Sequence, residues 1–153
     1  MADPFQSPET AASGEDEVDP ALAVPGLLVK IAALVQGVTG IFVAMSGVQL
    51  VAFFHLDTWV QFLALMLVLV GGTTAVLAAF TGQGRDWAAG LSVLLMGLQV
   101  LLAVGWCLYA LYIGLLSVLA IMGAALTLLA APLALAAVPG AMKASAARRQ
   151  LYR

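Results

Sequence analysis

Residues 26–37 read GLLVKIAALVQG, an apolar run that contains one charge near its start, Lys30. The run continues to Phe53 and exceeds the ~20 residues that a helix needs to cross a hydrocarbon core of ~30 Å. If the core begins near Leu27, Lys30 lies about 5 Å deep at the helical rise per residue, and its ammonium can reach the headgroups. We therefore interpret Lys30 as a membrane anchor, with a charge in a transport pathway as the alternative.

The rest of the chain also has the composition of a membrane protein. Of its 153 residues, 63% are hydrophobic and 9% are charged, which leaves too little polar surface for a soluble domain. The apolar segments must be helices, because an open strand edge in lipid leaves backbone groups unpaired. Short connectors force antiparallel neighbours, so the sequence predicts an all-α, integral membrane four-helix up-down bundle over residues 21–140. The expected spans are residues 27–53, 59–80, 87–109 and 113–138.

The connector between the third and fourth spans is the least defined. Residues 110–114 read ALYIG and carry no charge, and Gly114 is the strongest breaker there. A tight turn and one long bent helix are both compatible with residues 105–118. Because about 50 apolar residues are too many for a single span, we expect two helices.

The charged residues are segregated along the chain. Residues 1–20 are acidic and rich in Pro and Ser, and we expect them to form a disordered tail. Residues 141–153 form a basic tail. With four spans, every base falls on the side of the termini, which the positive-inside rule makes cytoplasmic. These membrane-anchoring residues are Lys30, Arg85, Lys143, Arg148, Arg149 and Arg153.

The basic tail has two interpretations. Residues 142–153 (MKASAARRQLYR) could form an amphipathic helix on anionic lipid headgroups, which would gain up to about 1 kcal/mol per charge. In the alternative, these bases only set the topology. The sequence leaves both open.

Several polar residues are expected near the middle of the bilayer, at similar depth in the four spans. They are Thr39, Thr73, Thr74, Gln99 and Thr127. Such a polar layer could form a substrate site at the midplane. The simpler interpretation is packing through interhelical hydrogen bonds, worth roughly 0.6–2 kcal/mol each.

The first span carries small residues at helical spacing, namely Ala33, Gly37, Gly40 and Ala44. Small residues let helix backbones approach closely. This face is therefore expected to meet either another span or another copy of the chain.

Residues suited to catalysis or metal binding are sparse. No Asp or Glu lies in any span, which argues against the family of small four-span multidrug exporters, since these use a glutamate in the first span. His55 and Asp57 stand in the first connector, but two ligands do not make a zinc site. Cys107 has no basic neighbour in sequence that would activate its thiol. The sequence thus predicts no catalytic set, no cofactor, no metal site and no nucleic-acid surface.

The acidic tail carries one family resemblance. Residues 3–9 read DPFQSPE, which resembles the Asn-Pro-Tyr-x-x-Pro start of many uncharacterised bacterial small multi-span membrane proteins. Asp3 stands in place of Asn and Phe5 in place of Tyr, and the resemblance covers six residues. It implies a protein of the bacterial cytoplasmic (inner) membrane with a cytoplasmic tail, and it implies no activity.

Together these features predict a non-enzymatic accessory or scaffold subunit. Its expected partners are the lipid bilayer and either further copies of itself, as a homo-oligomer, or a larger membrane complex. The alternative is a small transporter or channel subunit that uses the midplane polar layer. A membrane enzyme acting on lipid is a third class, and it would depend on His55 and Asp57.

Overall fold

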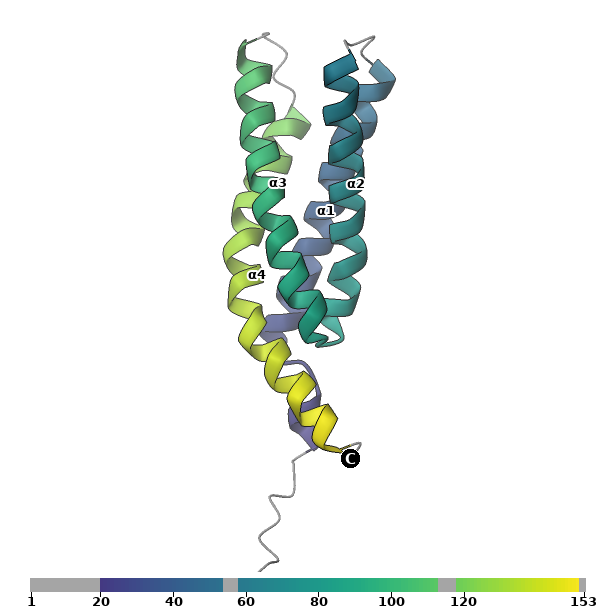
Figure 1. Ribbon diagram of the computed structural model, residues 1–153. Coiled ribbons are helices and arrows are strands. Elements are labelled where there is room, and N and C mark those ends of the chain that lie inside the picture. The colour runs from purple at the N-terminus through teal and green to yellow at the C-terminus, as the bar shows by residue number, and fades with distance from the viewer. Residues whose placement is uncertain (1–19, 54–57, 113–117, 152–153) are drawn as a thin grey trace, which may run out of the picture.

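The computed structural model describes residues 20–53, 58–112 and 118–151, and the regular structure in these ranges is all helical (Figure 1). A short 3₁₀ helix, η2 (Pro20–Ala23), precedes four α-helices: α1 (Leu27–Phe53), α2 (Thr58–Gly82), α3 (Asp86–Tyr112) and α4 (Val118–Leu151). All four α-helices are long and apolar enough to cross a membrane. The predicted all-α bundle of four spans is confirmed.

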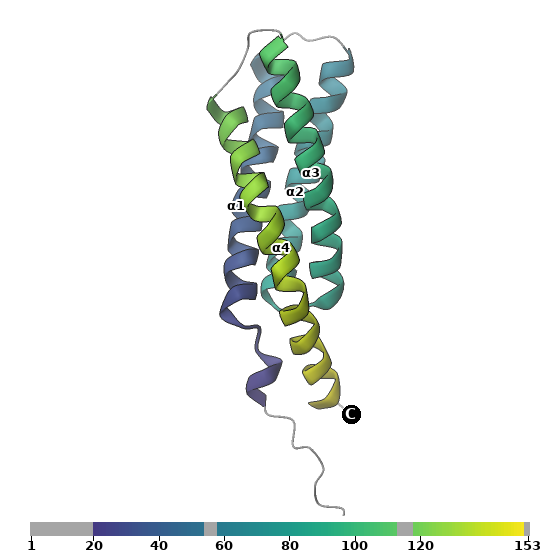
Figure 2. The same cartoon turned by 90° about the vertical axis from the view of Figure 1, so that its left-hand side faces the viewer.

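The helices pack in sequence order around the bundle. Each α-helix contacts its neighbours along the chain, and α1 also packs against α4. Figures 1 and 2 show the helices running up and down in turn, so that η2, the turn after α2 and the end of α4 share the lower end. The sequence had not determined this order. It follows that all the bases within the described ranges lie at or near the lower end.

Local chemistry sets the helix boundaries at the lower end. The carbonyl of Gly26 accepts hydrogen bonds from the amides of Val29 and Lys30, so α1 starts directly after Gly26. Between α2 and α3, Gly84 has a φ of 72°, and its amide donates to the carbonyl of Thr81. A residue in this left-handed conformation is almost always glycine, because it has no Cβ.

The third and fourth spans extend beyond their expected limits. The expected connector at residues 110–114 is partly wrong, since α3 continues through Tyr112, and residues 113–117 lie outside the described ranges. α3 and α4 are separate antiparallel helices rather than one bent helix (Figure 2).

The basic tail continues α4 as a helix to Leu151, past Pro139. Pro139 removes one hydrogen bond of the helix, and the alanines that follow favour helix. Ala141, Ala144 and Ala147 lie on one face and are buried, which holds this extension against the rest of the protein. At 34 residues, α4 is about 51 Å long, well beyond the ~30 Å of a hydrocarbon core.

The closest contact in the bundle joins the backbones of α1 and α2. A Cβ added at Gly40 would lie 2.6 Å from the carbonyl oxygen of Gly71, and one added at Gly71 would lie 2.6 Å from the amide nitrogen of Ala44. A Cβ at Gly47 would lie 2.6 Å from the carbonyl oxygen of Ala64. Backbone atoms cannot move aside as a flexible side chain can. The small-residue face of the first span therefore meets α2 of the same chain.

The side chains of the apolar core become smaller from the upper end of the bundle to the lower end. At the upper end, Trp106 packs with Leu50, Val60 and Leu67. Trp106 is 8% exposed, so it is a core residue rather than part of the aromatic belt that the membrane-interface preference of tryptophan would suggest. Toward the lower end, alanines such as Ala89 and Ala137 replace the large side chains.

Gly71 and Gly72 provide a matched pair for the α1–α2 contact. We expect Gly71→Ala to lower the free energy of unfolding by about 1–3 kcal/mol, because its methyl group would force the two helices apart. Gly72→Ala should not lower it and should raise it by up to about 1 kcal/mol, because alanine favours helix and no described atom outside the helix's own backbone lies within 4 Å of the added Cβ. Reversible unfolding in mixed detergent micelles measures both. Equal effects of the two substitutions would contradict the packing described here.

Candidate functional site

A set of buried polar side chains lies inside the bundle, and we call it the polar column. Each of its members is at most 1% exposed. The polar column consists of Gln36 and Thr39 of α1, Thr74 and Thr81 of α2, Ser92 and Gln99 of α3, and Thr127 of α4. All four helices therefore contribute polar groups to an interior that is otherwise apolar.

One hydrogen bond between side chains connects two helices within the column. The Nε2 of Gln99 donates to the Oγ1 of Thr74 at 2.9 Å and lies 3.4 Å from the carbonyl oxygen of Val70. Because Gly40 contacts Ala75, Thr39 lies at the level of Thr74. Three helices thus meet at one polar level near the middle of the bundle.

The column extends from this level toward the lower end. Thr81 lies seven residues below Thr74 in α2, and Ser92 lies seven residues below Gln99 in α3, so each is about 10 Å lower. Gln36 lies between these levels, about one turn below Thr39. The polar column therefore extends from the middle of the bundle into its lower half, and the upper end is filled by the cluster around Trp106.

Most hydroxyl groups of the column are satisfied within their own helix. Thr39, Thr74 and Thr127 each donate to the carbonyl oxygen four residues earlier, at 2.7–2.8 Å. Ser92 donates to the carbonyl oxygen of Ala89 at 2.9 Å. Such bonds satisfy a hydroxyl without help from a neighbouring helix, so these four residues are compatible with simple packing.

Gln36 differs from the rest of the column. Its side chain is fully buried, and neither its Nε2 nor its Oε1 has a hydrogen-bond partner among the described residues. The same holds for the Oγ1 of Thr81 and the Oε1 of Gln99. A buried polar group left without a partner costs about 1–3 kcal/mol. Gln36 therefore carries the largest unsatisfied polar capacity in the column.

The structure divides the polar layer that the sequence suggested. Thr39, Thr74, Gln99 and Thr127 are buried, but Thr73 lies on the outer face of α2, where its hydroxyl donates to the carbonyl oxygen of Leu69. Adjacent helical positions point about 100° apart, so Thr73 and Thr74 could not both face inward.

Sequence reasoning missed three members of the column. They are Gln36, Thr81 and Ser92. The available signal was their spacing, because each lies three or seven residues from a predicted polar residue and so shares its helix face.

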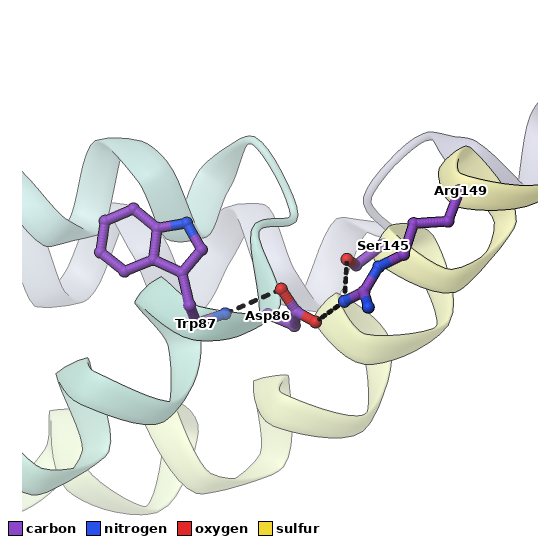
Figure 3. A network of polar contacts seen from close by, with 4 residues as sticks. All are labelled: Asp86, Trp87, Ser145 and Arg149. Carbon is purple, nitrogen blue, oxygen red and sulfur yellow. Dashed lines mark hydrogen bonds and ion pairs between the residues drawn. The ribbon is translucent and has the colours of Figure 1, made fainter. Parts of the chain in front are cut away.

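A second polar group lies at the lower end, where α3 begins (Figure 3). One carboxylate oxygen of Asp86 accepts a hydrogen bond from the amide of Trp87 at 2.9 Å, as expected for an acid at a helix N-terminus. The other oxygen forms an ion pair with Arg149 of α4, which also contacts the hydroxyl of Ser145 at 3.3 Å. Arg149 is 70% exposed, so this pair contributes at most about 1 kcal/mol.

Arg148 joins three segments of the lower end. Its Nε donates to the carbonyl oxygen of Ala23 in η2 at 2.9 Å, and its Nη2 donates to the carbonyl oxygen of Gln83 in the α2–α3 turn. Two acceptors on different segments fix the end of α4 more firmly than one exposed ion pair. The basic extension of α4 is therefore bound to the protein itself through Arg148 and Arg149.

The other predicted anchoring bases have varied surroundings. The Arg85 guanidinium lies 5.2 Å from the ring centre of Phe80, within the range of a cation–π contact. Lys30 and Lys143 are exposed. Arg153 lies outside the described ranges.

The other residues considered for catalysis or metal binding form no cluster within the described ranges. His55 and Asp57 lie outside the described ranges, and Cys107 is half-buried in α3. The residues that the structure describes contain no group of three or more side chains able to hold a metal ion.

The unpartnered amide of Gln36 leads to a test of the column. We expect Gln36→Leu to raise the free energy of unfolding by about 1–3 kcal/mol, because it replaces an unsatisfied amide with an apolar side chain of similar size. Gln99→Leu should not raise it, since that change removes the bond to Thr74. Unfolding in mixed micelles compares the two variants. A loss of stability in Gln36→Leu would show that the amide has a partner in the membrane.

Comparison with protein-family models, with curated proteins and with solved structures finds no match to the chain.

Proposed function

We propose that this protein is a non-enzymatic accessory or scaffold subunit that binds a transmembrane helix through the outer face of α3. The partner helix belongs either to a larger membrane complex or to a second copy of the chain. The observation that supports this proposal is a set of glycines on α3 that pack against no other described helix. At Gly90, Gly97 and Gly105, no described atom outside the backbone of α3 itself lies within 4 Å of the position that a Cβ would take.

These glycines contrast with those between α1 and α2. Glycine in a helix interior costs about 1 kcal/mol relative to alanine. At Gly40 and Gly71 the close backbone contact explains that cost. At Gly90 and Gly97, no contact in the described part of the chain explains it. A helix of another protein could approach these positions as closely as α1 approaches α2.

The outer face of α3 has the form of a helix-docking surface. Gly90 and Gly97 are seven residues apart, so they lie within about 20° of each other around the helix. Leu94 and Leu101 lie on the same face and are 71% and 72% exposed. Alternating glycine and leucine form hollows and knobs that suit a second helix.

The buried fractions of the four spans also favour α3 as the helix that binds a partner. In the most apolar window of α3, 22% is buried inside the protein, compared with 39% in α1 and in α2. α3 therefore has the largest unpartnered surface of the four. In lipid, that surface gains little from burial itself, so the glycines rather than the leucines would decide where a partner binds.

A pair of substitutions tests this surface. We expect Gly90→Ile with Gly97→Ile to abolish co-purification of the partner, because the added side chains fill the hollows, while the free energy of unfolding changes by less than about 1 kcal/mol. Quantitative mass spectrometry of the tagged protein, purified from its native membrane in lipid nanodiscs, identifies the partner. Ala136→Ile, on the exposed face of α4, is the control. Retention of the same partner by the double variant would refute the proposed surface.

We further propose that the protein resides in a bacterial inner membrane with both termini cytoplasmic. Two observations support this: the resemblance of residues 3–8, and the clustering of bases at the lower end. The described members of that cluster are Lys30, Arg85, Lys143, Arg148 and Arg149, and they lie at the end that carries η2 and the C-terminal part of α4. Positive charge is retained on the cytoplasmic side during insertion.

The unpartnered groups of the polar column favour a second candidate, a small transporter or channel subunit. Gln36, Thr81 and Gln99 together offer buried donors and acceptors that a small polar solute or a file of water could bind. Because the cluster around Trp106 closes the upper end, such a path would need the bundle to open.

Flux measurements distinguish this candidate from the scaffold. If the column conducts, Gln36→Leu with Gln99→Leu should reduce the swelling rate of proteoliposomes in a polar-solute gradient at least tenfold, without loss of folded protein. Gly97→Ile should leave that rate unchanged. Equal rates in wild-type and protein-free vesicles would exclude transport of the solute tested.

A further inference from the structure

A groove runs along the outside of the α1–α2 pair, on the face that points away from the bundle interior. It has a volume of about 420 Å³ and is lined almost entirely by apolar atoms. Its floor is made of small residues, Ala33 and Gly37 of α1 and Ala75, Ala78, Ala79 and Gly82 of α2. We call it the α1–α2 groove. These short side chains leave the outer surface of the α1–α2 pair hollow, next to the level at which Gly40 and Gly71 let the backbones approach.

One charged residue lines this groove. Lys30 lies at its lower end, one turn above the start of α1, and its side chain is exposed. The single carboxylate within the described ranges is Asp86, which is paired with Arg149 of α4. No described residue therefore supplies an anion to Lys30. The groove offers an apolar channel that ends at a cation.

The dimensions of the groove match one leaflet of a bilayer. Its lining in α1 extends from Lys30 to Ile41, eleven residues, which corresponds to ~16 Å along the helix. This is about half of a ~30 Å hydrocarbon core. Because Lys30 is at the lower end, the apolar part lies in the leaflet on the side of the termini.

The shape of the groove favours an acyl chain over a helix as its occupant. The groove is open along its length, and its floor consists of alanine and glycine. A single extended hydrocarbon chain is much thinner than a helix of about 10 Å in diameter and can lie on such a floor.

We propose that the α1–α2 groove binds an anionic phospholipid of this leaflet. One acyl chain lies along Gly37 and Ala78, and the phosphate lies at the Nζ of Lys30. Basic residues beside a hydrophobic groove between transmembrane helices are suited to such headgroups, and a lysine near the interface favours anionic over zwitterionic lipid. Lys30 is then part of a specific lipid site, which is independent of the proposed surface on α3.

Native mass spectrometry of the delipidated full-length chain tests this site. The probes are palmitoyl-oleoyl phosphatidylglycerol and, as the zwitterionic comparison, palmitoyl-oleoyl phosphatidylcholine. We expect wild type to bind one phosphatidylglycerol preferentially, and Lys30→Gln to weaken that binding about fivefold, the change that one interfacial charge supports. Lys143→Gln, which removes an exposed base outside the groove, should leave this first binding event unchanged.

A second pair of variants tests the apolar part of the site. Ala79→Phe places a ring in the groove from an exposed position and should weaken binding of both lipids, whereas Ala136→Phe on α4 should weaken neither. Two results would overturn the proposal at this step. One is unchanged lipid binding in Ala79→Phe. The other is dissociation of a dimer by Ala79→Phe, because a second copy would then occupy the groove.

The acidic tail is the competing anion within the chain. A variant with Glu15→Gln, Asp16→Asn, Glu17→Gln and Asp19→Asn removes the four acids nearest in sequence to Lys30. The proposal predicts that wild type and this variant both prefer phosphatidylglycerol. If only the neutralised variant shows the preference, the tail occupies Lys30 and the lipid site is refuted, as it also is if Lys30→Gln binds phosphatidylglycerol like wild type.

Discussion

The contact between the backbones of α1 and α2 is the constraint on which the rest of this structure depends. Lipid tails are as apolar as leucine, so burial of apolar surface does little to drive helices together inside a membrane. Close approach of the two backbones provides the attraction that apolar burial does not, because dispersion attraction falls off steeply with distance. Gly40 and Gly71 permit that approach, and a single methyl group at either position would meet backbone atoms at 2.6 Å. The pair they form is the platform on which α3 and α4 pack.

That tight pair also determines where polar groups can lie. The level of closest approach brings Thr39 and Thr74 together, and Gln99 of α3 then bonds to Thr74 across the interface. Threonine and serine satisfy their hydroxyls within their own helices, so they fit a dry interior at little cost. The larger amide of a glutamine is not satisfied by its own helix in this way. Neither polar atom of Gln36 has a hydrogen-bond partner among the described residues. The column thus contains hydroxyl groups that are satisfied within their own helices and one amide, that of Gln36, that has no partner among the described residues.

The two proposed binding surfaces follow from different uses of small residues. Between α1 and α2, small residues bring the backbones together and leave a hollow on the outer side, which Lys30 lines at one end. On α3, Gly90 and Gly97 leave hollows that nothing in the described chain fills. At the lower end, Arg148 and Arg149 hold the extension of α4 against η2, the α2–α3 turn and the start of α3. Lys30 and Lys143 remain exposed to lipid headgroups or solvent.

The sequence by itself determined the number of spans, their helical state and the clustering of the bases, because length, hydropathy and backbone satisfaction in lipid leave no other solution. It identified the small residues of the first span and four of the residues of the polar column. It did not determine the order of the helices, the outward position of Thr73, the burial of Gln36 or the continuation of α4 past Pro139. These depend on which face of each helix meets a neighbour. A span that is apolar on every side carries too weak a periodic signal to indicate that face, so only the tertiary contacts of the glycines decided it.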